Sequence, residues 1–189
     1  MHDVVRSHKL DIHYWCSSRA DYINESTVRL LKESGCFMIS LGAESGSQVI
    51  LDGISKNISV SQIVESCKII ERANLCLRLT ISIGHKGETL ETINETIDLL
   101  NKVKPTQIAL YILKVYPGTP LYLEMVENKQ LSDDYWEDPH NPIVPFYTVD
   151  HSINTLNEYI KRIEESIQGT IIRRYQSELG SVELSIRWG

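Results

Sequence analysis

Two hydrophobic patterns alternate along the first 130 residues of the chain. Short, nearly continuous apolar runs predict strands of a parallel sheet that is covered by other elements. Longer segments with apolar residues three and four positions apart predict amphipathic helices. The predicted strands are residues 10–16, 37–43, 77–83 and 108–113. The predicted helices are residues 24–35, 59–73, 89–103 and 120–128.

This alternation predicts the fold class α/β. Helical crossovers make the sheet parallel, and right-handed crossovers place the helices on one face when the sheet curls. Four βα units are half of an eight-stranded barrel, so we expect a partial (βα) TIM-type barrel with four parallel strands in residues 1–130. Residues 131–189 are expected to be an irregular loop followed by a helical C-terminal extension, with one helix over 154–175. Residues 182–188 fit either a short strand or a loose tail.

Composition narrows the class of protein. The chain has 189 residues, of which 42% are hydrophobic and 23% charged, which is typical of a globular domain. A net charge of −6 argues against broad binding to nucleic acid or to anionic membranes, both of which need excess Lys and Arg. No apolar run approaches the roughly 20 residues of a membrane span, and the first residues lack a signal-peptide pattern. We therefore expect a cytoplasmic protein without a membrane partner.

The cysteines give no metal motif. Cys16, Cys36, Cys67 and Cys76 show neither CxxC nor CxxxC spacing, so the sequence predicts no zinc site and no iron–sulfur ligands. We expect these four residues to be small apolar fillers, because free cysteine is among the most buried residue types.

Polar turns follow all four predicted strands, and they supply the candidate binding residues. Because the carboxyl ends of parallel strands meet at one edge of a sheet, these turns are expected to share one ligand pocket. The candidate residues are Arg19, Glu44, Ser45, Gly84, Gly87, Glu88 and Tyr116. No catalytic residue stands out among them.

Each turn also has a purely structural interpretation. Glu44 and Ser45 fit a helix start, where a carboxylate and a hydroxyl are favourable. The turn of residues 84–88 fits an ordinary βα loop, and the turn at Tyr116 fits a helix that begins at a proline. Arg19 could form a salt bridge with Asp21 or Glu25.

The order of the four turn motifs resembles the radical S-adenosylmethionine (radical SAM) superfamily, most closely its branch that is often fused to a cobalamin-binding domain. The motifs are residues 15–21, 39–47, 83–89 and 116–122, and the resemblance covers residues 10–128. It implies a partial (βα)6 barrel that holds S-adenosylmethionine near the strand ends. By this resemblance, Glu44 and Ser45 lie near the ribose and methionine part and Arg19 near the carboxylate, while the 84–88 turn and Tyr116 lie beside the adenine.

The chain departs from the family pattern in two places. The CxxxCxxC loop that holds the family's [4Fe-4S] cluster is absent, and His85-Lys86 stands where the family usually has Leu-Pro. The resemblance therefore implies the C-terminal portion of a radical SAM iron–sulfur oxidoreductase or transferase, inactive alone and poor in residual affinity for S-adenosylmethionine. Its cofactors in the intact protein would be S-adenosylmethionine and the [4Fe-4S] cluster, with cobalamin as a further candidate. 5′-Deoxyadenosyl-radical chemistry would act on a small-molecule substrate that the sequence leaves open.

The first partner expected is the missing N-terminal part of the same barrel. Without those strands, a sheet edge and an apolar inner face would be exposed, so we expect the isolated chain to form a homodimer.

Two other function classes compete with the radical SAM interpretation. One is a conventional TIM-barrel hydrolase or lyase with Glu44 and Glu88 as acid and base. The other is a noncatalytic interaction module that docks a partner through the helix of residues 154–175.

Overall fold

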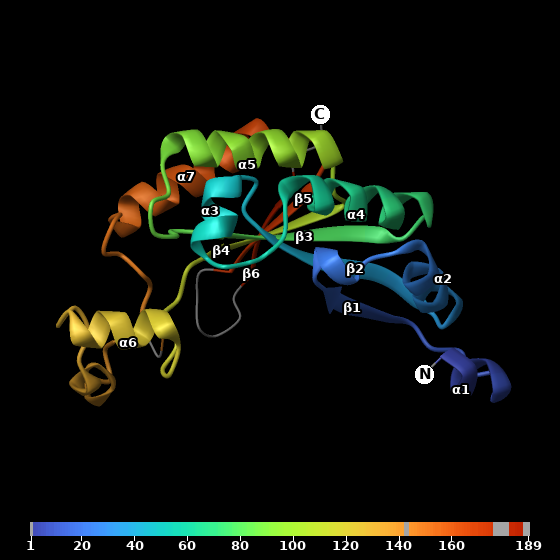
Figure 1. The fold of residues 1–189 in the computed structure, drawn as a ribbon, viewed down its shortest axis with the longest axis horizontal. Helices are drawn as coiled ribbons and strands as arrows, with labels where there is room; N and C mark the ends of the chain where they lie inside the picture. Colours follow the sequence, from blue (N-terminus) through green and yellow to red (C-terminus); the bar gives the residue numbers. More distant parts are fainter. Residues whose placement is uncertain (1, 142–143, 176–181, 187–189) are drawn as a thin grey trace.

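A single six-stranded sheet organises the structure, a computed structural model that describes residues 2–141, 144–175 and 182–186 (Figure 1). The strands follow one another in sequence order, and all neighbours are parallel except the last pair, which is antiparallel. The strands are β1 (Tyr14–Ser18), β2 (Cys36–Glu44), β3 (Cys76–Ile83), β4 (Gln107–Ile112), β5 (Ile171–Tyr175) and β6 (Val182–Ile186). The predicted α/β class is confirmed, with five parallel strands in place of four.

Helices α3, α4, α5 and α7 lie together on one face of this sheet, as Figure 1 shows. The helices are α1 (His2–Ser7), α2 (Glu25–Glu33), α3 (Gln48–Gly53), α4 (Val60–Arg72), α5 (Leu90–Val103), α6 (Pro120–Glu127) and α7 (Ile153–Ser166), with the 3-10 turns η1 (Ala20–Tyr22) and η2 (Asp133–Glu137). Capping side chains begin three of these helices: the side chains of Asn24, Ser59 and Thr89 accept hydrogen bonds from backbone amides of α2, α4 and α5. Helix α3 was not predicted from the sequence.

The two faces of the sheet differ because side chains alternate along each strand. On β3, Leu79, Ile81 and Ile83 are fully buried in the main hydrophobic core, together with residues of α4, α5 and α7. The intervening Arg78 and Thr80 point to the uncovered face and are partly exposed. The described inner face is therefore mixed and not simply apolar: Arg78 and Thr80 share it with Trp15 and Met38, which are register partners on β1 and β2. The proposal of self-association keeps the β1 edge as its main support.

The predicted helix of residues 154–175 is wrong in its second half. Helix α7 ends at Ser166, Ile167 is extended, and Gly169 has a left-handed φ of 70° that turns the chain back. Residues Ile171–Tyr175 then form β5, parallel to β4. Ile163, Ile167 and Ile171 keep helical spacing, but this apolar periodicity continues across a real break. Residues 182–186 form a strand, which settles the open interpretation of that segment; residues 187 and 188 lie outside the described part.

A second, smaller core lies beyond the carboxyl end of β4, around α6. Val115, Met125, Leu131 and Tyr147 are buried in it, and aromatic rings of α6 and η2 pack against them. Within the described ranges, no helix is both long enough and apolar enough to cross a membrane.

Candidate functional site

A hollow of about 460 Å³ opens on the uncovered face of the sheet, near the carboxyl ends of β1 and β2. The register of the strands explains why the lining of the hollow is polar. Ser17 of β1 pairs with Ser40 of β2, and Gly42 of β2 pairs with Thr80 of β3, so these small residues share one face. The full lining is Ser17, Ser18, Arg19, Tyr22, Ser40, Gly42, Glu44, Lys56 and Thr80. The volume falls in the range of about 300–1,000 Å³ that small-molecule sites occupy.

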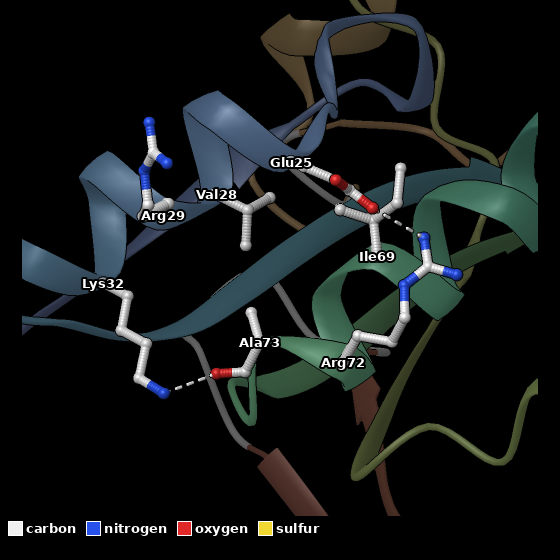
Figure 2. Close-up of a pocket in the computed structure, with 7 residues that line it drawn as sticks. All are labelled: Glu25, Val28, Arg29, Lys32, Ile69, Arg72 and Ala73. Atoms are coloured by element: carbon white, nitrogen blue, oxygen red, sulfur yellow. Dashed lines mark hydrogen bonds and ion pairs between the residues drawn. The ribbon is translucent and has the colours of Figure 1, made fainter.

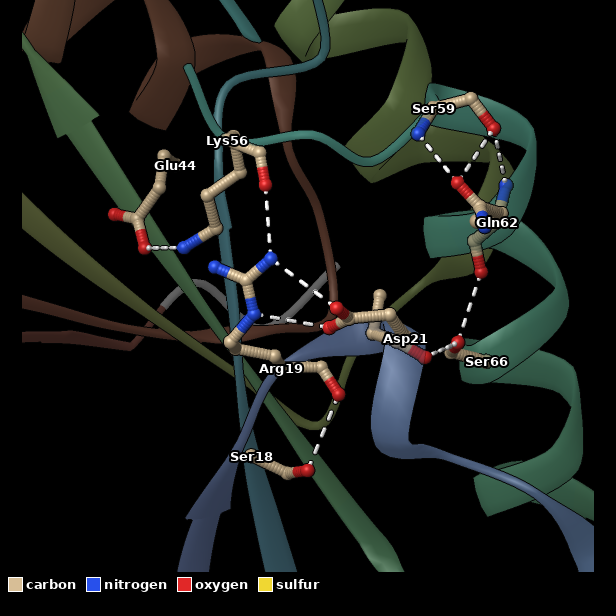
Figure 3. A network of polar contacts seen from close by, with 9 residues as sticks. Ser18, Arg19, Asp21, Glu44, Lys56, Ser59, Gln62 and Ser66 are labelled. Carbon is tan, nitrogen blue, oxygen red and sulfur yellow. Dashed lines mark hydrogen bonds and ion pairs between the residues drawn. The ribbon is translucent and has the colours of Figure 1, made fainter. Parts of the chain in front are cut away.

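Glu44 enters this hollow from an irregular point at the end of β2. The register of β2 with β3 shifts between Gly42 and Glu44, and Glu44 has a left-handed φ of 64°. A left-handed backbone costs a residue with a side chain about 1–2 kcal/mol, and such strain is concentrated at functional sites. Lys56, in the turn after α3, donates from Nζ to Glu44 Oε1 at 2.7 Å (Figure 3). Only 15% of the Lys56 side chain and 24% of the Glu44 side chain are exposed.

Arg19 lies on the rim of the hollow, where three hydrogen bonds hold its guanidinium. Nε and Nη2 donate to the two carboxylate oxygens of Asp21 at 3.0 and 3.2 Å, and Nη2 also donates to the Lys56 carbonyl at 2.8 Å (Figure 3). Of the two salt bridges that the sequence left open, the structure therefore shows the one to Asp21. Arg19 also fixes the turn that carries Lys56.

The glycines around Glu44 have two different roles. A Cβ on Gly42 would lie 2.8 Å from Glu44 Oε1 and 3.4 Å from Lys56 Nζ, so this glycine leaves room for the ion pair and the hollow. Gly46 instead lies against the backbone of α5. Ser45 is buried, and its hydroxyl lies 3.3 Å from Thr96 Oγ1 of α5 and accepts from the Ser47 amide. Ser45 therefore joins β2 to α5 and does not line the hollow.

The turn of residues 84–88 is held closed by its own side chain. Glu88 is 2% exposed, and its carboxylate accepts a hydrogen bond from the Gly84 amide at 2.5 Å. Gly84 and Gly87 both have left-handed φ angles, 100° and 76°, which favour glycine. His151 donates from Nε2 to the Glu88 carbonyl at 2.8 Å, which ties the turn to the chain before α7. The structure shows the turn as a βα loop outside the lining of the hollow.

Glu88 should make folding stability depend on pH. Burial raises its pKa to about 7 from an ordinary value of 4.5, although hydrogen bonds from the Gly84 and His85 amides oppose the shift. Between these values the folded state keeps a proton that the unfolded state releases. The stabilisation of the folded state by this bound proton is therefore complete below pH 4.5 and is lost as the pH rises through 7.

We expect Glu88→Gln, which keeps the acceptor for Gly84 but cannot titrate, to remove about 2 kcal/mol of the change in unfolding free energy between roughly pH 5 and 8. Urea unfolding of both proteins at the two pH values measures this difference, and other titrating groups cancel in the comparison. Identical pH profiles for the two proteins would contradict the assignment.

The next two residues of the turn, His85 and Lys86, differ in burial. His85 is buried, burial lowers the pKa of its imidazole, and its Nε2 has no hydrogen-bond partner in the described structure. Lys86 is exposed and donates to Glu124 of α6 at 2.7 Å. Lys86 is thus a solvated lysine that links the turn to α6.

Tyr116 begins the turn before α6 and is 53% exposed. Its carbonyl accepts hydrogen bonds from the amide and hydroxyl of Thr119, which caps α6 ahead of Pro120. This is the helix that begins at a proline. Of the seven candidate residues, the structure places Arg19 and Glu44 in the hollow, and Ser45, Gly84, Gly87, Glu88 and Tyr116 outside its lining.

The cysteines are only partly the buried fillers that were expected. Cys36 and Cys67 are buried and Cys16 is half-buried, with its Sγ 3.9 Å from that of Cys36. Cys76 is exposed at the start of β3, so the filler interpretation is wrong there. Among the described residues, no group of three His, Cys, Asp or Glu side chains could hold a metal ion.

A second hollow, of about 300 Å³, lies outside the sheet between α2 and α4 (Figure 2). Its polar groups connect the two helices: Lys32 donates to the Ala73 carbonyl at 2.7 Å, and Arg72 lies 3.4 Å from Glu25. Because these contacts serve helix packing away from the strand ends, the hollow at β1 and β2 is the candidate site.

Comparison with known proteins assigns the chain to a family. A profile of the radical SAM superfamily matches residues 2–100, which include both Glu44 and Lys56. The chain belongs to the radical SAM superfamily. It is 31% identical over 132 residues to an uncharacterized methyltransferase of Pyrococcus horikoshii, a match that covers 70% of this chain and 29% of the relative. It is 24% identical over 110 residues to the anaerobic magnesium-protoporphyrin IX monomethyl ester cyclase of Cereibacter sphaeroides, covering 58% of the chain and 18% of that enzyme.

Solved structures share the fold. The methyltransferase TsrM from Kitasatospora setae, with cobalamin and a [4Fe-4S] cluster bound, superposes with a TM-score of 0.60 at 18% identity, covering 67% of this chain and 26% of TsrM. Methylornithine synthase superposes with a TM-score of 0.59 at 14% identity, covering 90% of this chain and 42% of the synthase. These matches confirm the predicted α/β partial-barrel fold. The chain spans less than a third of the length of these curated relatives.

Lys56 is the main site residue that sequence reasoning missed. It lies in the turn after the unpredicted helix α3, and no motif marks it. Ser40 and Thr80 did carry a signal, because they are polar residues at alternate positions of otherwise apolar strands.

Proposed function

We propose that this radical SAM chain supplies the S-adenosylmethionine-binding side of a half-barrel and that the hollow at β1 and β2 receives this cofactor. The observation that carries the proposal is the Glu44–Lys56 pair, a carboxylate and an ammonium 2.7 Å apart at the end of β2, within the region that the superfamily profile matches. The strained backbone of Glu44 supports a binding role, because such strain is concentrated at functional sites.

The residues of the hollow fit the groups of S-adenosylmethionine. The cofactor carries an ammonium, a carboxylate, a sulfonium and ribose hydroxyls. Glu44 can accept hydrogen bonds from an ammonium or from hydroxyls, and Lys56 and Arg19 can attract the carboxylate. Ser17, Ser40 and Thr80 line the same hollow, and their hydroxyls can both donate and accept.

No CxxxCxxC occurs in this sequence, and we propose that the cluster ligands come from another part of the intact protein. When bound, a reduced [4Fe-4S] cluster supplies the electron that cleaves S-adenosylmethionine for radical chemistry. This chain's residues would bind and orient the cofactor and exclude water, and the chain alone would be inactive. We propose that the missing strands pair with the free edge of β1. The likeness to TsrM supports cobalamin as an additional cofactor of the intact protein.

Glu44→Gln tests the cofactor site. A hydrogen bond to a charged group contributes about 1.5–3 kcal/mol, so we expect at least about a tenfold loss of S-adenosylmethionine affinity in the intact, anaerobically reconstituted protein. Calorimetric titration measures the affinity, and chromatography measures the 5′-deoxyadenosine formed. Glu65→Gln, on the outer surface of α4, is the matched control and should bind normally.

Unchanged affinity in Glu44→Gln would refute the proposed placement of the cofactor. Submicromolar affinity in the isolated 189-residue chain would refute the expectation that the chain alone binds poorly. Light scattering of the same sample tests whether the β1 edge drives dimerisation.

The two alternative functions find less support. A hydrolase or lyase with Glu44 and Glu88 as acid and base needs both carboxylates at one pocket, but Glu88 is buried in its own turn. An interaction module needs an available face on the helix after residue 150. Leu156, Ile160 and Ile163 of α7 are instead fully buried against the sheet.

A further inference from the structure

The uncovered face of the sheet carries two arginines that form no ion pair with a described acidic side chain of the strands. Arg78 lies on β3 and Arg173 on β5, each at a position that alternates with residues facing the helices. Among the described strand side chains, Glu44 is the only acidic one, and Lys56 already pairs with it. The face is therefore positively charged, although the whole chain has a net charge of −6.

Neighbouring contacts hold Arg78 in place. Its Nε and Nη2 both donate to Gln107 Oε1, at 3.2 and 3.0 Å, and its guanidinium lies 5.2 Å from the centre of the Trp15 ring. Gln107 and Trp15 are neutral, so they orient the guanidinium without neutralising it. An arginine has five N–H donors, so Arg78 retains donors for a ligand.

Arg173 contrasts with the next residue along the chain. Arg174 faces the helices and pairs with Glu164 of α7. Arg173 faces the open side, and its Nε is buried without a hydrogen-bond partner in the described structure. Leaving a buried donor unsatisfied is unfavourable, and more so when the donor is charged. The best partner for a guanidinium is an anion that accepts two parallel hydrogen bonds.

A row of small residues connects Arg173 to the candidate site. Gly42, Thr80 and Ala109 are successive register partners across β2, β3 and β4, and Ala109 pairs with Arg173 on β5. Gly42 and Thr80 also line the hollow proposed for S-adenosylmethionine. The row has no large side chain of its own between that hollow and Arg173, but Ala109 is only 1% exposed, so a ligand reaching Arg173 must displace the side chains that cover Ala109.

We propose that the substrate of this half-barrel carries an anionic group, a carboxylate or a phosphate, that binds Arg173, while Arg78, two strands away on β3, adds positive charge to the same face. The identification of the ligand as substrate rests on the proposed function. The anion site itself rests only on the two arginines, their neutral surroundings and the small-residue row.

Arginine NMR of the 189-residue chain tests the site directly. The chain is labelled with ¹⁵N-arginine, and the Nε–H resonances are followed during titration with glutarate and, separately, with inorganic phosphate. We expect saturable shifts for Arg173 and Arg78, with a dissociation constant on the order of 1 mM for the better anion. The anion with the lower dissociation constant shows whether the site prefers a carboxylate or a phosphate.

Arg173→Gln should weaken anion binding at least tenfold, whereas Arg29→Gln, on the outer surface of α2, should leave it unchanged. Arg173→Lys keeps the charge and assigns the Arg173 resonance even if the glutamine variant does not fold. Shifts that do not saturate, or that Arg29→Gln reduces as much as Arg173→Gln does, would overturn the proposal.

Affinity for S-adenosylmethionine, measured in the intact protein, separates this inference from the proposed function. Arg173→Gln should retain that affinity within about twofold, a change below 0.5 kcal/mol. Normal cofactor binding without saturable shifts at Arg173 would overturn the anion site alone. Saturable shifts without any cofactor binding would refute the proposed function and leave the anion site in place.

Discussion

Gly46→Ala is expected to lower the free energy of unfolding by about 3–4 kcal/mol, because the added methyl group has no space. A Cβ on Gly46 would lie 2.5 Å from Thr96 Cα and 2.6 Å from the Glu95 carbonyl oxygen. Both atoms belong to the backbone of α5, which cannot move without disturbing the main core. The Gly46 amide also donates to Thr96 Oγ1 at 2.9 Å, and the same displacement would lengthen this bond.

Urea unfolding measures the effect of this substitution, and Gly53→Ala is the matched control. Gly53 is the last residue of α3, and nothing lies within 4 Å of the position of its Cβ. Alanine there should leave stability unchanged or raise it by up to about 1 kcal/mol. Wild-type stability in Gly46→Ala would show that β2 and α5 are less closely packed than the structure indicates.

Gly46 illustrates what the sequence could and could not predict about the site. A glycine after a strand-end carboxylate is typical of a place where a ligand approaches the backbone, but the element that approaches Gly46 is α5. Gly42 fits the ligand interpretation, since its missing side chain opens the hollow. The two glycines differ only in tertiary surroundings, which local sequence does not encode.

The regular elements were predictable where pattern and boundary signals agreed. Helix α4 has apolar residues at helical spacing and a capping box at Ser59, and both signals were present in the sequence. Helix α3 has only six residues, too few to show a period. Strand β5 was hidden because Ile167 and Ile171 extend the spacing of α7, while Gly169 was the one signal of a break.

The polar residues of the inner face were likewise predictable only where a local sequence signal marked them. Glu44 was predictable because it directly follows an apolar strand. Lys56 was not, because its position depends on the hydrogen bond from Arg19 to its carbonyl, 37 residues away in sequence. Arg173 could be recognised only after β5 had been found, since in a helix it would have faced elsewhere.

Glu164→Ala is expected to lower the free energy of unfolding by about 3–5 kcal/mol, because it removes one partner of a largely buried ion pair. Both carboxylate oxygens of Glu164 accept hydrogen bonds from the Arg174 guanidinium. The Glu164 side chain is 6% exposed and that of Arg174 24%, so water cannot readily replace the lost contact. The pair joins α7 to β5, and its loss should weaken the attachment of β5 to β4.

Hydrogen exchange separates this local effect from general destabilisation: amides of β5 should lose protection before those of β3. Glu165→Ala is the matched control, since Glu165 is the next residue of α7, has a side chain 51% exposed and lies 3.9 Å from Lys161. An exposed pair of this kind contributes at most about 0.5 kcal/mol. Equal losses in the two variants would contradict the burial of the Glu164–Arg174 pair. Because Arg173 is held by the same strand, Glu164→Ala should also weaken anion binding at the inner face, whereas Glu165→Ala should not.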